Sequence, residues 1–404
     1  YHTHHGPITH SIDGKWVATK INWDPVNALQ QSFIRTKTGS YAELRAMMDI
    51  RTNSTNNTVY ADADGNIAYF HGNFVPRRDP RFDYSKPVDG SDPATDWQGL
   101  HSVDEIVTLL NPENGWIQNA NSTPFTAAGE HSPQAADFPR YMAPDAENFR
   151  GLHAVRVLQG RGNFTLDKLI DAAYDPYLPA FAVLIPGLVQ AFDRAGSKQP
   201  QLAPAIDALR DWDYRVALDS VPMTLAHFYG ERMRAEEPGP AGFSRMAKIE
   251  YHGSGASDDR RLEVFARTVA QLETDFGSWR TPWGEVNRLQ RLDGAIKSRF
   301  DDEQPSLPIG MASGRWGALA SFGARSVDDT KRIYGYAGNS FVAVVDFGDR
   351  VNAKSLLAGG QSGDPASPHF FDQGQRYADR QFKDVAYYRE DVERRAARRY
   401  RPGE

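Results

Sequence analysis

The sequence predicts a protein of the α+β class, because strand signals toward both ends enclose a long helical middle. Residues 8–19 and 58–74 each show the alternation and the central Asp-Gly turn of a β-hairpin. Residues 342–347 form another alternating, partly apolar run, whereas the chain between about 150 and 275 is predicted to be helical. We therefore expect three portions: a sheet-rich part at 1–150, a mainly helical lobe at 151–280, and a return to the sheets with a C-terminal helix at 281–404.

Cap and loop residues define the remaining elements of the first portion. Residues 41–48 predict one short helix. Ser102 and Glu105 have the spacing of a capping box, which predicts a further helix that ends near residue 111. Residues 76–100 are rich in Pro, Asp and Arg and have no period, so we expect a long loop of the kind that carries function.

The helical middle and the tail have distinct signals. Residues 181–192 are strongly apolar, and we expect this helix to be interrupted at Pro186-Gly187. Further helices are expected over 202–212 and 261–276. The tail beyond Asp391 is basic and helical, which favours a solvated helix on an acidic surface over a contact with nucleic acid.

The composition excludes several classes of function. The chain has 404 residues, 24% of them charged, and a formal net charge of -6, so nothing points to nucleic acid or to an anionic membrane surface as a partner. It contains no cysteine, which excludes disulfides, thiolate catalysis and cysteine-based metal sites within it. No run of apolar residues is long enough to predict a membrane span.

Four separated segments carry the functional signal. They are YADADGNIAY at 60–69, GWIQNANSTP at 115–124, Arg150 with Arg156, and GQSGDP at 360–365 followed by SPH at 367–369. In this order they resemble the β subunit of the penicillin amidase family, whose members are N-terminal-nucleophile amidohydrolases such as penicillin, cephalosporin and acyl-homoserine-lactone acylases. The resemblance covers almost the whole chain. It implies a four-layer αββα sandwich of two antiparallel sheets flanked by helices, and hydrolysis of an acyl amide.

This chemistry needs a hydroxyl or thiol at the start of a subunit, with the free α-amine as its base, and donors that stabilise the tetrahedral oxyanion. The resemblance implies that Asn121 supplies the side-chain amide donor, while Asn119 is expected to be structural. It also implies that Arg150 holds Asn121 and the region of the nucleophile through its guanidinium donors. Arg156 is expected to be structural.

The resemblance further implies that the nucleophile lies on another segment, because Tyr1 cannot serve as one. The expected partners are an α subunit and an N-terminal part of the β subunit, and this chain alone is expected to be inactive. The expected substrate is a small acyl amide. Together with the absence of cysteine, the resemblance fits a periplasmic or secreted bacterial protein.

Aromatic side chains are candidates for the walls of the acyl pocket. The candidates are Phe70, Phe74, Phe125 and Phe138.

No cofactor is required for this reaction, although a structural calcium ion occurs in some members of the family. The matching positions are the carbonyl of Pro80 and the carboxylate of Asp137, and this part of the resemblance leaves the ion's presence open. Asp62 and Asp64 are expected to form a plain hairpin turn, not a calcium loop. The histidines at positions 2, 4 and 5 suggest zinc, but the segment resembles a family strand, which favours a structural role.

Two alternatives stay open. The chain can belong to an acyl-homoserine-lactone or lipopeptide acylase of the same family, or to an inactive member that binds ligands. The first residue of the segment that carries the nucleophile distinguishes catalysis from binding, since only Ser, Thr or Cys at a processing junction supports catalysis.

Overall fold

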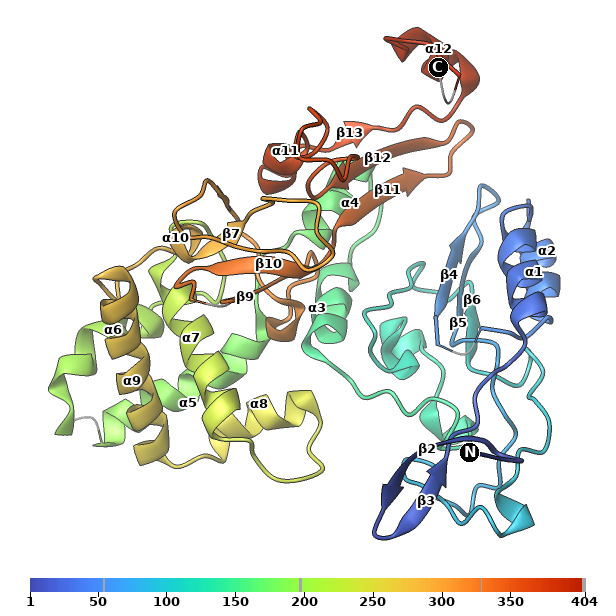
Figure 1. Cartoon of the computed structure of the whole chain (residues 1–404), viewed down its shortest axis with the longest axis horizontal. Coiled ribbons are helices and arrows are strands. Elements are labelled where there is room, and N and C mark those ends of the chain that lie inside the picture. The colour runs from blue at the N-terminus through green and yellow to red at the C-terminus, as the bar shows by residue number, and fades with distance from the viewer. Residues whose placement is uncertain (54, 196–197, 328, 402–404) are drawn as a thin grey trace. The chain divides into compact units, whose positions relative to one another are not determined.

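In the computed structural model, residues 1–53, 55–195, 198–327 and 329–401 are described. The chain divides into two compact units, Tyr1–Glu147 and Asn148–Glu404, which we call unit 1 and unit 2. Each unit mixes helices with small sheets, as the α+β prediction requires (Figure 1). The four-layer order of the sheets stays a prediction.

Unit 1 contains two three-stranded sheets, in the orders β1-β2-β3 and β4-β5-β6. Its strands are β1 (His2–Thr3), β2 (Gly6–Ile12), β3 (Lys15–Ala18), β4 (Thr58–Ala61), β5 (Ile67–Phe70) and β6 (Thr108–Leu110). Its helices are α1 (Pro25–Arg35) and α2 (Tyr41–Met48), with short 3-10 turns η1 (Pro93–Thr95), η2 (Pro124–Thr126), η3 (Gly129–His131) and η4 (Ala135–Asp137).

Both predicted hairpins and the predicted short helix of unit 1 are confirmed. Strand β2 pairs antiparallel with β3, and β4 pairs with β5 in a register that runs from Thr58 opposite Phe70 to Ala61 opposite Ile67. The turn between β4 and β5 is closed by Asp62, whose carboxylate accepts from the Asn66 N–H at 2.9 Å. This aspartate therefore has the structural role that was expected of it.

The core of unit 1 lies between helix α2 and the β4-β5-β6 sheet. Leu44, Met47 and Met48 of α2 are buried together with Ala68 and Phe70 of β5. Burial of such an apolar face provides the main free energy that holds a short helix on a sheet.

Helix α1 was not predicted from the sequence. Asp24 caps its N-terminus by accepting from the Asn27 N–H, and Pro25 occupies the first turn. The apolar residues of this helix include Val26, Leu29 and Phe33, whose side chains are exposed. The positions of these residues therefore do not indicate which face of the helix is buried.

The helix predicted after Ser102 is wrong. The Glu105 carboxylate does accept from the Ser102 N–H at 2.8 Å, so the capping-box contact exists around a single turn. The chain then enters β6, which pairs with β5. Ladder hydrogen bonds and the burial of Val103, Ile106 and Val107 outweigh the local helix signal.

Unit 2 begins with the helical region and ends with two small sheets. Its α-helices are α3 (Phe149–Leu158), α4 (Leu166–Ala173), α5 (Pro179–Ala195), α6 (Ala203–Arg210), α7 (Val221–Glu236), α8 (Arg245–Ser254), α9 (Asp258–Phe276), α10 (Trp283–Val286), α11 (Gly374–Ala378) and α12 (Arg389–Arg395). Its 3-10 turns include η6 (Pro200–Leu202) and η7 (Gly314–Trp316).

The strands of unit 2 form the orders β8-β7-β10-β9 and β11-β12-β13, and β7 runs parallel to β10. They are β7 (Asn287–Leu289), β8 (Leu307–Pro308), β9 (Phe322–Arg325), β10 (Ile333–Gly338), β11 (Phe341–Asp346), β12 (Asn352–Leu357) and β13 (Lys383–Asp384). The predicted strand at 342–347 is confirmed as β11.

Helix α5 runs without a break through Pro186, so the predicted interruption is wrong. Proline removes one backbone donor, but the helix buries Leu184, Ile185 and Leu188 completely in the main core of unit 2. Phe181 of the same helix stacks on Trp316 with ring centroids 4.6 Å apart. This packing compensates for the lost hydrogen bond.

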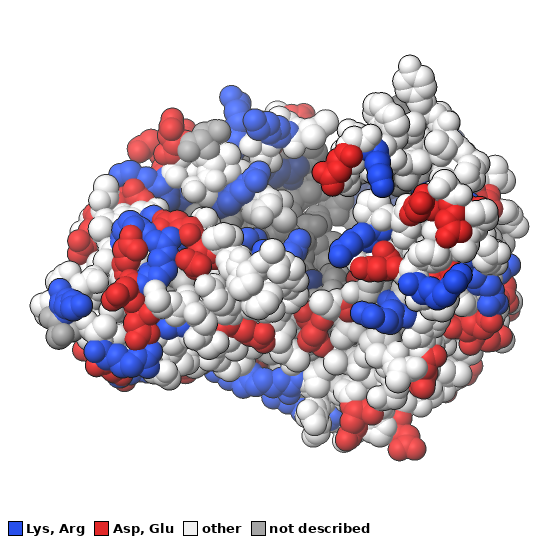
Figure 2. Space-filling model, turned by 90° about the horizontal axis from the view of Figure 1, so that it is seen from below, with Lys and Arg blue, Asp and Glu red and all other residues white. Residues whose placement is uncertain are grey.

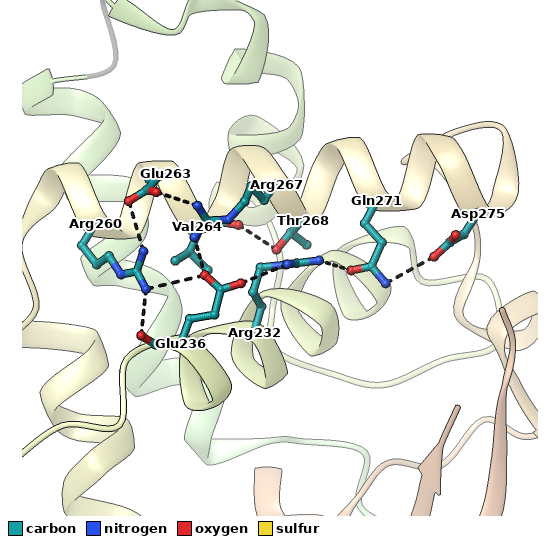
Figure 3. Close-up of polar contacts among 9 residues, drawn as sticks. All are labelled: Arg232, Glu236, Arg260, Glu263, Val264, Arg267, Thr268, Gln271 and Asp275. Atoms are coloured by element: carbon teal, nitrogen blue, oxygen red, sulfur yellow. Dashed lines mark hydrogen bonds and ion pairs between the residues drawn. The ribbon is translucent and has the colours of Figure 1, made fainter. Parts of the chain in front are cut away.

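A polar network joins α7 to α9 on the surface of unit 2 (Figure 3). Glu236 pairs with Arg232 at 3.0 Å and with Arg260 at 3.5 Å, and it also accepts from Arg267. Arg232 donates to Gln271 of α9 as well. Several charges that share one carboxylate fix the register of the two helices better than an isolated surface pair would.

Charge is mixed on the surface. On the face drawn in Figure 2, Lys and Arg lie interspersed with Asp and Glu. Among the described residues, no helix combines the length and the apolar character that a bilayer crossing requires.

Candidate active site

A cavity of about 390 Å³ in unit 1 brings two predicted site residues together, Asn121 and Phe74. Its size falls in the usual range for small-molecule sites. Its wall comes from the segment before β4, the loop after β5, the loop around Asn121 and the segment before α3. The lining residues are Thr55, Asn57, His71, Gly72, Phe74, Val75, Pro76, Arg78, Asn121, Tyr141, Met142, Pro144 and Asp145.

Asn121 lies on this wall with φ at 54°, in the left-handed region. Asparagine tolerates this conformation better than most residues with a Cβ. Such a conformation at a cavity wall is a frequent mark of a functional position. Asn119 is exposed and accepts at 3.1 Å from the Asn57 amide, which fits a structural role.

The loop that presents Asn121 is held at its base by buried hydrogen bonds. The Gln118 N–H donates to the Ala127 carbonyl at 2.8 Å, and its side-chain amide donates to the Thr126 carbonyl at 3.3 Å. The Thr126 hydroxyl donates to Glu147 at 2.6 Å. Residues 115–119 have no regular secondary structure. One backbone bond and two bonds from side chains therefore hold this loop in place of a strand ladder.

A hydrogen-bonded chain of three side chains borders the cavity. Tyr69 and His71 point to the same side of the chain because they are two residues apart at the end of β5. The His71 Nε2 lies 3.0 Å from Asp145, and its Nδ1 lies 2.8 Å from the Tyr69 hydroxyl. Burial lowers the pKa of His71 although Asp145 opposes this effect. Neutral His71 thus donates to Asp145 and accepts from Tyr69.

Arg78 supplies a cation at the same cavity. Its guanidinium lies 5.1 Å from the ring centre of Tyr84 and 5.9 Å from those of Trp97 and Tyr141. Burial lowers the pKa of Arg78 below its ordinary value. Its Nε has no hydrogen-bond partner among the described residues. Aromatic faces therefore stabilise the charge of this buried guanidinium.

His71, Arg78, Tyr141 and Asp145 were not predicted. A signal existed for Arg78, since the loop 76–100 was expected to carry function and contains adjacent arginines and aromatic residues. For His71 and Asp145 the sequence offers no signal, because they are 74 positions apart and only folding pairs them.

Arg150 belongs to unit 2, whereas the cavity that contains Asn121 belongs to unit 1. It lies in the first turn of α3, where the Asn148 side chain caps the helix by accepting from the Arg150 N–H at 3.0 Å. The Arg150 side chain lies against Gly314. A Cβ added to Gly314 would lie 2.7 Å from the Cδ of Arg150. Burial lowers the pKa of Arg150. A role in holding Asn121 stays a prediction.

Arg156, six residues further on in the same helix, has structural contacts. Its guanidinium lies 3.9 Å above the ring centre of Tyr177 and 3.9 Å from the Asp175 carboxylate.

The other predicted pocket residues lie in unit 1 outside the cavity wall. Phe70 is buried in the core, and Phe125 packs against the same core. The rings of Phe125 and Phe138 are 6.2 Å apart. Of the aromatic candidates, Phe74 alone belongs to the residues that line this cavity.

The predicted calcium ligands Pro80 and Asp137 are both exposed, on the loop 76–100 and on η4. Calcium takes six or more oxygens, and one carbonyl with one carboxylate falls well short of that number. The neighbouring Asp79 carboxylate already accepts from Arg81 at 2.6 to 3.0 Å. The residues present therefore do not by themselves fit calcium.

Comparison with known proteins places these features in a family. A family model described as penicillin amidase matches residues 1–394. The chain is 25% identical over 393 residues to the acyl-homoserine lactone acylase PvdQ of Pseudomonas putida, which covers 89% of this chain and 48% of that protein. It is 27% identical over 168 residues to penicillin G acylase of Escherichia coli, which covers 39% of this chain and 18% of that protein.

The chain thus spans less than half the length of these curated relatives. A thermostable penicillin G acylase from Alcaligenes faecalis shares its fold with a TM-score of 0.63 at 18% identity, over 99% of this chain and 77% of that one. The family match and this shared fold agree with the order of motifs along the sequence. The chain belongs to the penicillin amidase family.

Proposed function

We propose that this chain forms part of an amidohydrolase that removes an acyl group from an amide, and that Asn121 donates to the oxyanion. Membership in the penicillin amidase family supports amide hydrolysis in general. The observation that carries the residue assignment is the position of Asn121, in a left-handed conformation on the wall of the 390 Å³ cavity beside Phe74.

In this proposal the nucleophile comes from another segment, as in the family's reaction. A hydroxyl or thiol attacks the amide carbon, the C–N bond breaks, the amine leaves with a proton, and water then hydrolyses the acyl-enzyme. Asn121 Nδ2 donates to the carbonyl oxygen while it carries negative charge, and Arg150 positions Asn121. An α subunit and the N-terminal part of the β subunit are the proposed partners, in the periplasm or outside the cell.

An acyl-homoserine lactone is a second candidate substrate. The supporting observation is the relative named for this activity, because its similarity extends over 89% of the chain. Hydrolysis of the acyl amide bond of a lipopeptide or of a penicillin would be a reaction of the same class.

The test begins with the intact protein purified from its own host. We would determine the mass and the N-terminal sequence of every polypeptide that copurifies with this chain, and then assay chromogenic amides of aliphatic and arylacetic acids. We expect a companion that begins with Ser, Thr or Cys, and hydrolysis of at least one amide. A companion that begins with any other residue, combined with no hydrolysis, would contradict the proposal.

A further inference from the structure

His4 and His5 of unit 1 form a pair whose rings lie on one side of the chain. They occupy the turn between β1 and β2, so the alternation of a strand does not separate their side chains. Their ring centroids are 3.7 Å apart with an interplanar angle of 42°. Gly6, which follows them, has φ at 123°, and a Cβ there would lie 2.3 Å from the Thr19 carbonyl oxygen. The turn is therefore held closely against the end of β3.

The hydrogen bond of His5 determines which of its nitrogens carries a proton. Nε2 lies 2.8 Å from the Gly90 carbonyl oxygen, which can only accept, so Nε2 donates. Nδ1 then faces the Asp96 carboxylate at 3.4 Å. In neutral His5 this places a lone pair opposite a negatively charged oxygen. A cation between the two atoms, either a proton or a metal ion, removes the repulsion.

A third donor converges on the same point. His4 Nε2 lies 3.9 Å from the same Asp96 oxygen, and the ligand atoms of His4, His5 and Asp96 all lie within 4.8 Å of one another. Zinc bonds of about 2.0 to 2.2 Å place tetrahedral ligands about 3.3 Å apart. The side chain of His4 is 68% exposed, so it has room to rotate toward that separation.

We propose that His4, His5 and Asp96 bind a divalent transition-metal ion of the zinc class, which fastens the β1–β2 turn to the loop 76–100. Two imidazoles and one carboxylate suit zinc and exclude the hard, oxygen-seeking calcium ion. The bond from His5 to the Gly90 carbonyl is the outer-sphere contact that metal-bound histidines almost always make. With three protein ligands, water completes the coordination.

This site is separate from the cavity that contains Asn121, since none of its three ligands lines that cavity. They belong instead to the turn and to the stretch after η1, where His4, His5 and Asp96 border a different cavity of about 940 Å³. The proposed ion is therefore structural, and its ligands lie outside the Asn121 cavity, although Arg78 lines both cavities.

The test is a Zn²⁺ titration of the chelator-stripped intact protein in competition with a chromophoric chelator. We expect one site, and we expect Asp96→Asn and His5→Gln each to weaken it by at least about 10-fold, the loss that even an outer-sphere partner causes. Co²⁺ should give the visible absorption bands of a tetrahedral nitrogen–oxygen site in the wild type and not in Asp96→Asn.

The matched controls are His2→Gln and His10→Gln, exposed histidines of β1 and β2 outside the cluster. Both should leave the Zn²⁺ affinity unchanged, and Ca²⁺ should not compete with Zn²⁺. Zn²⁺ should also raise the urea midpoint of the wild type but not that of Asp96→Asn, a readout independent of activity. Equal affinity of wild type and Asp96→Asn would overturn the proposal, because it would mean adventitious binding to the histidine-rich segment.

Discussion

Asn121 combines a left-handed backbone conformation with a position on the wall of the cavity in unit 1. Its left-handed φ is tolerated by asparagine and is strain-free for glycine. Glycine at this position therefore removes the amide and leaves the loop conformation accessible, a cleaner change than alanine.

We expect Asn121→Gly in the intact protein to lower kcat by about 10²- to 10³-fold, because loss of one oxyanion donor costs that much in other hydrolases. KM should change far less, since the donor acts on charge that develops during the reaction. Steady-state kinetics on a chromogenic amide measure both constants. Asn119→Gly is the control and should retain most of the activity. Equal losses in the two variants would count against the assignment of Asn121.

His227 is a buried titratable group that should make the free energy of unfolding depend on pH. Its Nδ1 accepts from the Trp316 indole at 3.2 Å, and its ring lies 4.9 Å from that of Trp283. Burial lowers the pKa of His227 to about 4. In the unfolded state His227 is protonated below about pH 6.5, whereas in the folded state it stays neutral until the pH is much lower.

The free energy of unfolding should thus decrease as the pH falls from about 6.5 to about 4, by up to about 1.4 kcal/mol per pH unit from this group. Above pH 6.5 the contribution is fully present. His227→Gln keeps an acceptor for Trp316 and cannot titrate, so its stability should depend less steeply on pH in this window. Urea denaturation at several pH values measures the slope, with the exposed His10→Gln as control. An unchanged slope in His227→Gln would show that other groups dominate acid unfolding.

At the scale of elements, the contact between α5 and α8 depends on two glycines. A Cβ on Gly187 would lie 1.7 Å from the Gly253 carbonyl oxygen, and one on Gly253 would lie 2.4 Å from the Val183 carbonyl oxygen. The obstructing atoms belong to the backbone, so they cannot rotate away as a side chain would. The two helices can approach this closely only because both positions lack a side chain.

We expect Gly187→Ala to lower the free energy of unfolding by about 1 to 3 kcal/mol, the usual cost of overpacking. Alanine favours a helix by up to about 1 kcal/mol over glycine, but the steric cost should prevail. Gly162→Ala is the matched control, because nothing lies within 4 Å of a Cβ there and its φ is not positive. Urea denaturation compares the variants at equal m-values. A stabilised Gly187→Ala would mean that the helices separate at little cost.

At the scale of the whole molecule, each unit has its own core. The core of unit 1 lies under the β4-β5-β6 sheet, whereas unit 2 has a large helical core and a smaller one around its sheets. The surface charge is mixed and the net charge is -6. Even in the basic tail, Arg394 donates to Asp391 and Arg395 pairs with Asp384 at 3.6 Å.

We therefore expect no retardation of duplex DNA in a gel-shift assay at physiological ionic strength. Binding to DNA needs a positively charged protein surface that displaces counterions from the phosphates. A basic DNA-binding protein serves as the positive control. Retardation that weakens steeply with added salt would show that the tail arginines leave their carboxylate partners for phosphates.

The predictions that held depend on local interactions. Glycine turns determine the hairpins of β2–β3 and β4–β5, and Ser40 caps α2 through the Glu43 N–H. The resemblance to the penicillin amidase family is confirmed by the match over residues 1–394, whereas the role of Asn121 stays a prediction. The sequence by itself determines these features, because the residues that produce each of them are neighbours in the chain.

What only the tertiary structure decided involves residues far apart in the chain. The capping box at Ser102 forms without a helix because β5 offers a strand partner, and α5 continues through Pro186 because the core packs around it. Likewise, Asp96 reaches His5, and Asp145 reaches His71, only after the chain has folded. Local sequence signals specify turns and helix caps. Strand pairing and side-chain burial depend on contacts between distant segments, and no local pattern in the sequence predicts which segments will come into contact.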